Sequence, residues 1–317
     1  MNAQMAIIAV LISACAAAFV QSTAHGADNM AESNDAEIRK PFPADTEAAE
    51  NFIRVAGQSA KIATIECTKR RSRTAADARA LAEIKSELDD SDSLISLTVD
   101  TEDHTVYYYS IGSKWVATEQ SHLAHTRSLT AEEAFDRSVP VLAHYGLSLN
   151  KVDYEVCRLD TIPLVSPWCI ERDLGCDGQI CIGSHVSILI SPVSGTIVKV
   201  TFRPARLPDE RERKPRITKL EALARAEEWL RTHKSPGTNE LLVDAKSLSK
   251  IDRVIALPNT FHGAIDRPEV TYPSVAHYCW QVPFRWTENR GTEWQGTFEG
   301  RLWISTYDGS IVGGDSS

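Results

Sequence analysis

An eleven-residue segment occurs twice in this chain and constrains its fold more than any other feature. Ile188–Val198 reads ILISPVSGTIV, and Leu302–Val312 reads LWISTYDGSIV, with five identical positions. In both copies, apolar residues that favour β-strands flank a Ser-Gly or Asp-Gly pair, and only glycine takes a positive φ without steric cost. Each copy therefore predicts a strand, a tight turn at Gly195 or Gly309, and a second strand.

A third segment has the same rhythm in degenerate form. Val99–Tyr107 reads VDTEDHTVY and places Asp103 and His104 where the other copies have their turn. Aspartate tolerates turn conformations because its short side chain bonds to nearby backbone groups. Repetition of this kind predicts a supersecondary motif that is used more than once, and it says little about chemistry.

Two capping boxes predict helices that precede the repeated hairpins. In Thr130-Ala-Glu-Glu133, the Thr hydroxyl accepts a bond from a backbone N–H of the first helical turn, and the Glu side chain binds the N–H of Thr130 in return. Thr218 and Glu221 have the same spacing. Apolar residues at helical spacing follow both boxes, which predicts amphipathic helices. Pro140 lies within the first of them and predicts a kink or an early end.

The rest of the chain predicts further helices and strands. Thr46–Val55 and Ala75–Leu88 have helical composition, the second being rich in Ala, Glu and Lys. Strands are expected at 93–99 and 105–111. After each capping box the order is a strand, a strand with an aromatic beside a cysteine, and the hairpin. The predicted fold class is α+β, with tandem units in which one helix packs on a small antiparallel sheet.

This order of elements divides the chain into six segments. They are a signal peptide (1–27), a disordered tether (28–45), a degenerate N-terminal α+β unit (46–127), a first helix-and-hairpin unit (128–204), a linker (205–216) and a second helix-and-hairpin unit (217–317). The tether is polar and punctuated by prolines, which is typical of disorder. The linker is charged and Pro-rich.

The amino terminus predicts export. Residues 1–27 contain no Lys, Arg, Asp or Glu, run apolar from Met5 to Val20, and end in small residues, as cleaved secretory signals do. The apolar run is shorter than the roughly 20 residues of a permanent transmembrane helix. We therefore expect a periplasmic or extracellular protein without a transmembrane helix in its mature chain. As an alternative, the residues before Cys15 resemble a bacterial lipobox, which would place a lipid anchor on Cys15.

The charge of the chain argues against nucleic acid as a partner. The formal net charge is −9, and the one basic cluster, residues 67–74, is interpreted as a solvated loop. Neutralising phosphates requires clustered Lys and Arg. We expect no nucleic-acid partner.

Six cysteines remain when Cys15 is set aside. An even number in an exported chain predicts disulfides, although the sequence leaves their connectivity open. The spacing lacks paired Cys-x-x-Cys motifs, which argues against structural zinc. The candidate disulfide cysteines are Cys67, Cys157, Cys169, Cys176, Cys181 and Cys279.

The common catalytic signatures are missing from the sequence. There is no Gly-x-Ser-x-Gly elbow, phosphate-binding loop, dinucleotide fingerprint or His-Glu-x-x-His motif. His122 and His125 could share one helical face as metal ligands, but no third ligand is identifiable, which favours histidines without a metal. The sequence therefore assigns no catalytic residue, cofactor or metal.

Aromatic residues concentrate near the carboxyl terminus. Alternation along the strand that begins at Tyr278 places Trp280 and Trp286 on the same face as Tyr278. If that face is open, the candidate ligand platform for sugar rings or peptide consists of Tyr278, Trp280, Trp286 and Trp294. The apolar stripe of the helix that begins near Thr218 needs a surface to cover, which favours a buried core instead.

The order of elements resembles the PepSY family of peptidase propeptides and YpeB-type proteins. Tyr278–Val282 and Trp303–Val312 stand where that family has its Tyr-x-Val strand and its Asp-Ala-x-Thr-Gly-x-Val ending. The chain departs from the pattern because Ser305 replaces the usual Asp, Asp308 replaces the Thr before Gly, and residues 258–276 form an insertion. The resemblance covers both helix-and-hairpin units.

This resemblance implies a function in binding. Such domains occur in peptidase propeptides and envelope proteins, where they are thought to inhibit or regulate proteases without being catalytic. It implies a non-catalytic, exported binding or regulatory protein with a polypeptide partner, an envelope protease among the candidates. Two alternatives stay open: a carbohydrate-binding module that uses the C-terminal aromatic strand, and a metal-dependent hydrolase that uses His122 and His125.

Overall fold

The computed structural model describes most of the chain from Pro43 onward. The described residues are 43–58, 60–66, 81–88, 94–112, 127–159, 166–232, 238–243, 248–258, 275–288 and 296–316. The predicted signal peptide, Cys15, Cys67, His122, His125 and Trp294 lie outside them. Among the described helices, none is long and apolar enough to cross a membrane.

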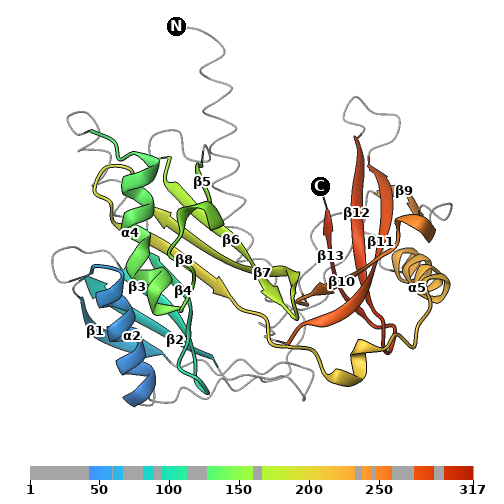
Figure 1. Ribbon diagram of the computed structural model, residues 1–317, viewed down its shortest axis with the longest axis horizontal. Coiled ribbons are helices and arrows are strands. Elements are labelled where there is room, and N and C mark those ends of the chain that lie inside the picture. Colours follow the sequence, from blue (N-terminus) through green and yellow to red (C-terminus); the bar gives the residue numbers. More distant parts are fainter. Residues whose placement is uncertain are drawn as a thin grey trace, which may run out of the picture. The chain divides into compact units, whose positions relative to one another are not determined.

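Strands dominate the described part of the chain (Figure 1). The helices are α2 (Pro43–Val55), α4 (Ala131–His144) and α5 (Lys219–Thr232), with short 3₁₀ turns η1 (Lys151–Asp153), η2 (Glu210–Arg213) and η3 (Leu248–Lys250). The strands are β1 (Ala60–Glu66), β2 (Leu81–Leu88), β3 (Leu94–Asp100), β4 (Val106–Ile111), β5 (Glu155–Arg158), β6 (Trp168–Cys176), β7 (Gln179–Ile190), β8 (Ile197–Arg203), β9 (Thr238–Val243), β10 (Asp252–Ala256), β11 (His277–Glu288), β12 (Gly296–Ser305) and β13 (Ile311–Ser316).

All of these strands belong to one mixed sheet, and this corrects the predicted fold class. The order is β1-β2-β3-β4-β8-β7-β10-β11-β12-β13, with β5 joined through β6 to β7, and β9 joined to β11. β7 and β10 pair in parallel at Cys181 with Ile255 and at Ile182 with Ala256. The two predicted units therefore do not have separate small antiparallel sheets. The repeat predicted hairpins correctly, but local sequence patterns do not reveal a pairing between strands about 75 residues apart.

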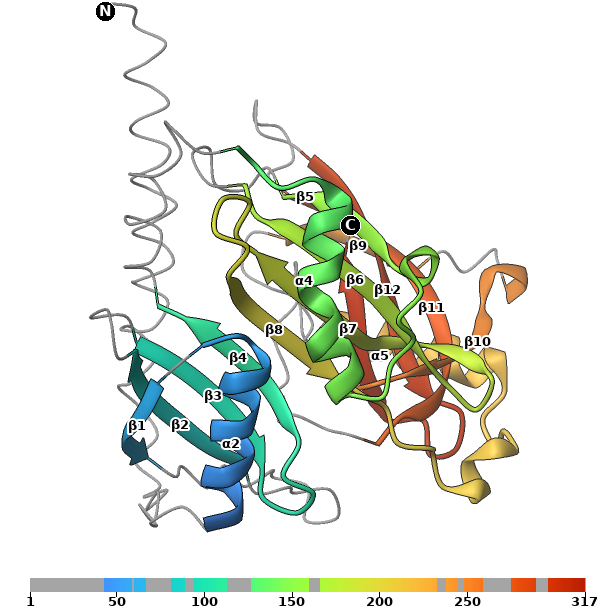
Figure 2. The ribbon, with the colours of Figure 1, turned by 60° about the vertical axis from the view of Figure 1, so that its left-hand side comes forward.

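The helices cover the sheet at two hydrophobic clusters. α2 and α4 pack over the strands from β2 to β8 (Figure 2). Phe52, Tyr109 and Leu142 are fully buried in this cluster. α5 packs on β11 and β12 through Ala226 and Leu230. Apolar residues at helical spacing face the sheet in all three helices, because burying that stripe drives the packing.

The helix predicted over Ala75–Leu88 is wrong in its described part, which forms strand β2. Leu81–Leu88 pairs with β1 on one side and β3 on the other, so its backbone groups are bonded to both neighbours. Ile84 is fully buried in the cluster beneath α2. Tertiary pairing thus overrides the helical preference of its Ala, Glu and Lys residues.

Two helix boundaries differ from prediction. α2 begins at Pro43, so the last residues assigned to the tether are helical, and Asp45 is fully buried. Proline is favourable in the first turn because the N–H it lacks has no partner there. Pro140 does not end α4, which continues to His144.

Both predicted capping boxes are confirmed. Thr130 Oγ1 accepts a bond from the backbone N–H of Glu133 at 3.2 Å, and Glu133 Oε2 accepts the N–H of Thr130 at 2.8 Å. In α5 the corresponding distances between Thr218 and Glu221 are 3.2 and 2.7 Å. The helix starts are thus bonded in the same way.

The turns at the two repeated segments share their hydrogen bonds. Ser191 Oγ accepts bonds from the backbone N–H groups two and three residues later, at 3.2 Å each, and Ser305 Oγ does so at 3.2 and 3.3 Å. Gly195 and Gly309 donate to the carbonyls of these serines at 3.2 and 3.0 Å. Their φ values of 72° and 74° confirm the predicted positive φ.

The turn predicted at Asp103 and His104 has the same arrangement. Asp100 Oδ1 accepts bonds from the N–H groups two and three residues later, at 2.8 and 3.4 Å. His104 takes the glycine position with φ 58° and donates its N–H to the carbonyl of Asp100 at 2.9 Å. Three hairpins of this sheet therefore close with one turn geometry.

Candidate binding site

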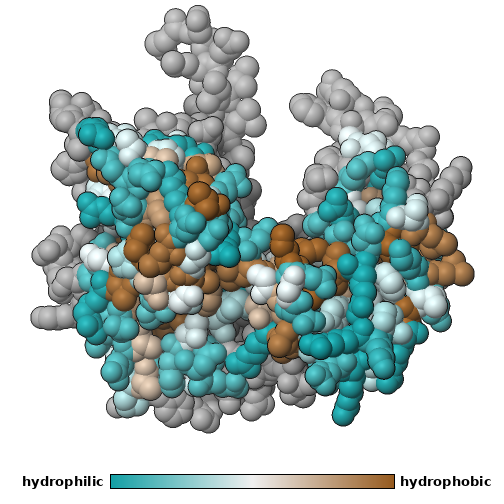
Figure 3. All heavy atoms as spheres, viewed as in Figure 1, coloured by the Kyte–Doolittle hydropathy of each residue, from teal (hydrophilic) through white to brown (hydrophobic). Residues whose placement is uncertain are grey.

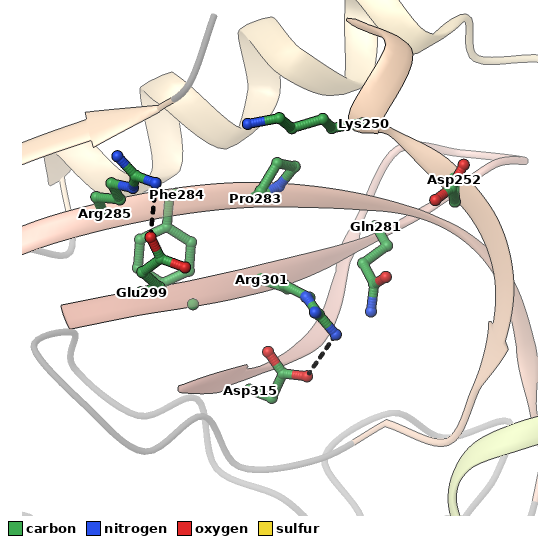
Figure 4. Close-up of a pocket in the computed structure, with 10 residues that line it drawn as sticks. Lys250, Asp252, Gln281, Pro283, Phe284, Arg285, Glu299, Arg301 and Asp315 are labelled. Atoms are coloured by element: carbon green, nitrogen blue, oxygen red, sulfur yellow. Dashed lines mark ion pairs between the residues drawn. The ribbon is translucent and has the colours of Figure 1, made fainter. Parts of the chain in front are cut away.

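A cavity of about 490 Å³ lies on the face of the sheet opposite α5 (Figure 4). We call it the charged groove; it is lined by Lys250, Asp252, Gln281, Pro283, Phe284, Arg285, Glu299, Gly300, Arg301 and Asp315. Alternation along β11 separates the two faces, because Val282 packs under α5 whereas Gln281 and Arg285 point the other way. The volume is within the range of small-molecule pockets, about 300–1,000 Å³.

Oppositely charged side chains pair across the strands of the groove. Arg285 on β11 lies opposite Glu299 on β12, with Nη2 to Oε1 at 2.7 Å. Arg301 on β12 lies opposite Asp315 on β13, with Nη1 to Oδ2 at 4.0 Å. These side chains are 45–62 % exposed. Exposed ion pairs contribute only about 0–1 kcal/mol to stability. A charged group of a ligand can therefore replace one partner of such a pair at a small cost in free energy.

The charges of the groove balance. Lys250, Arg285 and Arg301 supply three cations, and Asp252, Glu299 and Asp315 supply three anions. Polar Gln281 lies between them as the cross-strand partner of Asp252. The groove therefore suits a ligand that carries both signs of charge, rather than a polyanion.

Asp315 is the least exposed of the four side chains in these two ion pairs, at 45 %. Burial raises the pKa of its carboxyl, and the nearby Arg301 guanidinium and a backbone bond at Arg301 lower it in part. A desolvated carboxylate of this kind gains from an incoming cation, because an opposite charge stabilises its ionised form.

Gly300 shapes the middle strand of the groove. A Cβ at this position would lie 2.6 Å from Phe284 Cζ and 2.8 Å from the carbonyl oxygen of Asp315. No side chain fits there unless the backbone moves. Glycine thus allows the Phe284 ring to lie over β12, and it allows β13 to approach closely.

A buried donor without an acceptor lies on the same face. Trp303 is directly opposite Gln281, is 1 % exposed, and its Nε1 has no hydrogen-bond partner. It packs in a small cluster with Cys279 and Val312. Unsatisfied buried polar groups are rare, and each needs a cause such as strain, a functional role or a bridging water.

The predicted aromatic platform does not form one open surface in the described residues. Trp286 is buried beneath α5, and Trp280 packs at the edge of the same cluster and donates its Nε1–H to the carbonyl of Ile217 at 2.8 Å. Tyr278 packs in a different cluster, and its hydroxyl donates to Asp177. Trp294 lies outside the described residues. α5 thus covers the aromatic face, as the stripe of that helix indicated.

The five described cysteines are free thiols, so the predicted disulfides are not present among them. Burial raises the pKa of the Cys181 thiol to about 12 and that of Cys279 well above its ordinary value. Thiols with raised pKa values are poor nucleophiles. Cys67, the sixth candidate, lies outside the described residues.

No metal site is visible in the part of the chain that the structure describes. Its His, Cys, Asp and Glu residues form no group of three or more that could hold an ion. His122 and His125, the histidines of the alternative metal-dependent hydrolase, fall outside this part, so that alternative stays untested.

The surface shown in Figure 3 is mostly hydrophilic. Exposed large hydrophobic residues occur on separate elements: Leu94, Leu149, Val152, Ile180, Leu207, Leu220 and Leu248. They do not gather at the charged groove, which is therefore a polar site.

Sequence reasoning missed the groove. Gln281 and Arg285 alternate with the aromatic residues along β11. This alternation indicates that the strand has a second, solvated face. The cross-strand pairs themselves depend on the register of β11, β12 and β13.

Comparisons with known proteins find similarity among solved structures and not among family models or curated proteins. No family model matches the chain, and no curated protein matches it. Among solved structures, the Bacillus megaterium YpeB C-terminal domain is similar at a TM-score of 0.34 and 10% identity, covering 86% of this chain and 95% of that chain. Membership of the PepSY family stays a prediction from the sequence.

Proposed function

We propose that this protein is a non-catalytic binding protein that holds an extended polypeptide of mixed charge in the charged groove. The observation that supports this most is the ladder of cross-strand pairs, Arg285 with Glu299 and Arg301 with Asp315, on a solvated sheet face.

The spacing of the groove charges suits an extended chain. Glu299 and Arg301 are two residues apart on β12, so their side chains repeat at roughly 6.8 Å along the strand. Alternate side chains of an extended peptide repeat at the same distance. A peptide with alternating charge can therefore pair with successive groove residues.

The residues that line the groove favour binding over catalysis. They include no Ser, Thr or Cys that could act as a hydroxyl or thiol nucleophile, and no His to activate one. Glu299 and Asp315 are paired with arginines. The acidic residues also disfavour a phosphate backbone as the ligand.

The sequence adds a class of partner to this proposal. The export signal predicted at 1–27 places the protein in the periplasm or outside the cell, with the lipid anchor at Cys15 as the alternative. The PepSY resemblance of 217–317 favours a protease of the cell envelope as the polypeptide. Both rest on sequence alone.

Peptide selection against the full chain tests the proposal. We expect a random peptide library to yield binders with alternating acidic and basic residues, which the protein leaves uncleaved. The double variant Arg285→Ala/Arg301→Ala should weaken these binders at least tenfold, as judged by fluorescence anisotropy. The control Arg127→Ala removes a 76 % exposed arginine outside the groove and should leave binding unchanged.

Exchanging the two charges of one ion pair distinguishes an effect on peptide specificity from an effect on folding. Arg301→Asp combined with Asp315→Arg keeps a cross-strand ion pair but reverses its direction, so it should keep the melting temperature and prefer different peptides. Equal binding of the same peptides by the wild type, the double alanine variant and the charge swap would refute the groove as the site.

A further inference from the structure

Two cysteines face each other across the edge of the sheet. Cys157 on β5 and Cys169 on β6 are direct partners in the antiparallel register. β5 pairs with β6 alone among the described strands (Figure 2), so it is an edge strand. Cys157 is half-buried and Cys169 is buried.

The backbone bonds define the kind of pair that these cysteines form. Leu159 donates its N–H to the carbonyl of Pro167 at 3.0 Å, which makes 159 and 167 a hydrogen-bonded pair. Pair types alternate along an antiparallel ladder, so Cys157 and Cys169 are the next hydrogen-bonded pair. Their Cα atoms are therefore about 5.5 Å apart, within the range of roughly 4.4–6.8 Å that disulfides span.

None of the other described cysteines has a cysteine directly opposite it in the strand register, although Cys176 and Cys181 pack in one cluster. Cys176 lies opposite Gln179, Cys181 opposite Ile255, and Cys279 opposite Val254. We propose that Cys157 and Cys169 are a redox modification site, which a disulfide-carrying oxidant such as oxidised glutathione converts into a cross-strand disulfide.

The reaction balances in two thiol–disulfide exchanges. The Cys157 thiol loses its proton, and its sulfur attacks the disulfide of the oxidant, forming a mixed disulfide and releasing one glutathione thiolate. The Cys169 thiolate then attacks the Cys157 sulfur and releases the second glutathione. The two cysteines lose two protons and two electrons, and the oxidant disulfide gains both.

The surroundings of the pair make this reaction slow at neutral pH. Burial raises the pKa of the Cys157 thiol, and the negative charges of Glu155 and Glu171 raise it further. A hydrogen bond with Cys169 lowers this pKa in part. Burial also raises the pKa of the Cys169 thiol, and a hydrogen bond with Ser187 lowers it in part. Since the thiolate is the attacking species, the rate of bond formation should increase towards alkaline pH.

The disulfide should also be easy to reduce. Cβ atoms of a hydrogen-bonded pair are about 5.5 Å apart, whereas a relaxed disulfide needs about 3.5–4.5 Å. Closing the bond therefore draws β5 towards β6 and stores strain, which is typical of reversible rather than permanent disulfides.

The bond would hold the strands beside the start of α4. Arg158 and Trp168, the neighbouring cross-strand pair, bind the segment before this helix: Arg158 Nη1 donates to Ser128 Oγ at 2.9 Å, and Trp168 Nε1 donates to the carbonyl of Leu129 at 3.1 Å. Oxidation should therefore protect this region from local opening.

Peptide mapping of the full chain after incubation with oxidised glutathione tests the proposal. The expected product is a reducible link between the Cys157 and Cys169 peptides, formed faster at higher pH and removed by mild dithiothreitol without unfolding. Cys157→Ala should abolish this link and leave glutathione on Cys169 or no adduct, whereas the control Cys279→Ala should retain the link. Both thiols remaining alkylatable in oxidised wild type, or either one linked to another cysteine, would overturn the proposal irrespective of how the variants fold.

Discussion

Nδ1 of His104 lies 2.7 Å from Oδ1 of Asp45, and this contact joins the first turn of α2 to the turn between β3 and β4. Asp45 is fully buried, and its second carboxylate oxygen has no hydrogen-bond partner. An ionised carboxylate only accepts, so the ring nitrogen donates. His104 thereby supplies a hydrogen bond to one oxygen of a buried carboxyl group, from a turn position that the two related turns give to glycine.

His104→Gly should lower the free energy of unfolding despite relaxing the backbone. Glycine would relieve a positive φ that costs about 1–2 kcal/mol. His104 is itself 40 % exposed, but its removal leaves the fully buried Asp45 carboxyl without this partner. Such a loss costs about 1–3 kcal/mol, and more for a charged group, so the net loss should be about 1 kcal/mol in urea denaturation. Asp45→Ala/His104→Gly should be more stable than His104→Gly alone, because alanine leaves no unpaired carboxylate. A His104→Gly variant more stable than the wild type would contradict this account.

Gly309→Ala should destabilise the protein more than Gly195→Ala. Both positions have positive φ, which costs an alanine about 1–2 kcal/mol. A Cβ at 309 would lie 2.4 Å from Cζ of Arg225, whereas at 195 the nearest atom is Arg137 Nε at 3.1 Å. Arg225 donates to the carbonyl of Gly309 at 3.1 Å and would have to move. Thermal melts of the two variants compare the costs, and equal losses would exclude the contribution of Arg225.

Trp280 should matter for stability and leave peptide binding intact. Trp280→Phe removes the indole bond to the carbonyl of Ile217 and should cost about 1 kcal/mol. Trp168→Phe is the matched variant, because Trp168 donates to the carbonyl of Leu129 in the same manner. Normal melting of Trp280→Ala combined with loss of glycan binding would instead favour the carbohydrate platform.

Acid stability should depend on the two capping boxes. Backbone hydrogen bonds from Thr130 and Thr218 are the main causes that lower the pKa values of Glu133 and Glu221 below the ordinary 4.5. A lowered folded-state pKa contributes stability above the unfolded pKa, and this contribution is lost as pH falls through the folded value. Glu133→Gln/Glu221→Gln should therefore flatten the decline of unfolding free energy below about pH 4.5, as measured by urea denaturation across that range.

A glutamine at an exposed position outside the boxes serves as the control for this acid measurement. Glu227→Gln, on the exposed surface of α5, should leave the pH dependence unchanged. An acid slope in the double variant that equals the wild-type slope would show that the boxes do not contribute.

Local signals in the sequence predicted local structure. The capping boxes at Thr130 and Thr218 and the turns at Gly195 and Gly309 depend on residues within a few positions of one another, and each is present as expected. The stripe of α5 also indicated that the aromatic face of β11 is core.

Features that depend on distant pairing escaped prediction. Leu81–Leu88 carries helical residues, yet pairing with β1 and β3 makes it a strand. The parallel contact of β7 with β10 and the ladder formed by Arg301 and Asp315 require a register that no short motif encodes. Asp45 was assigned to the tether because nothing local shows that His104 binds it.

Site-specific photo-crosslinking in the producing cell tests the proposed binding groove most directly. A benzophenone side chain in place of Gln281 lies in the charged groove, and the same side chain at Val152, which is 83 % exposed, reports non-specific encounters. Position 281 should give a covalent adduct with a second polypeptide that position 152 does not give. Adducts of equal yield at both positions, or no polypeptide adduct at 281, would contradict the proposal that the groove holds a polypeptide.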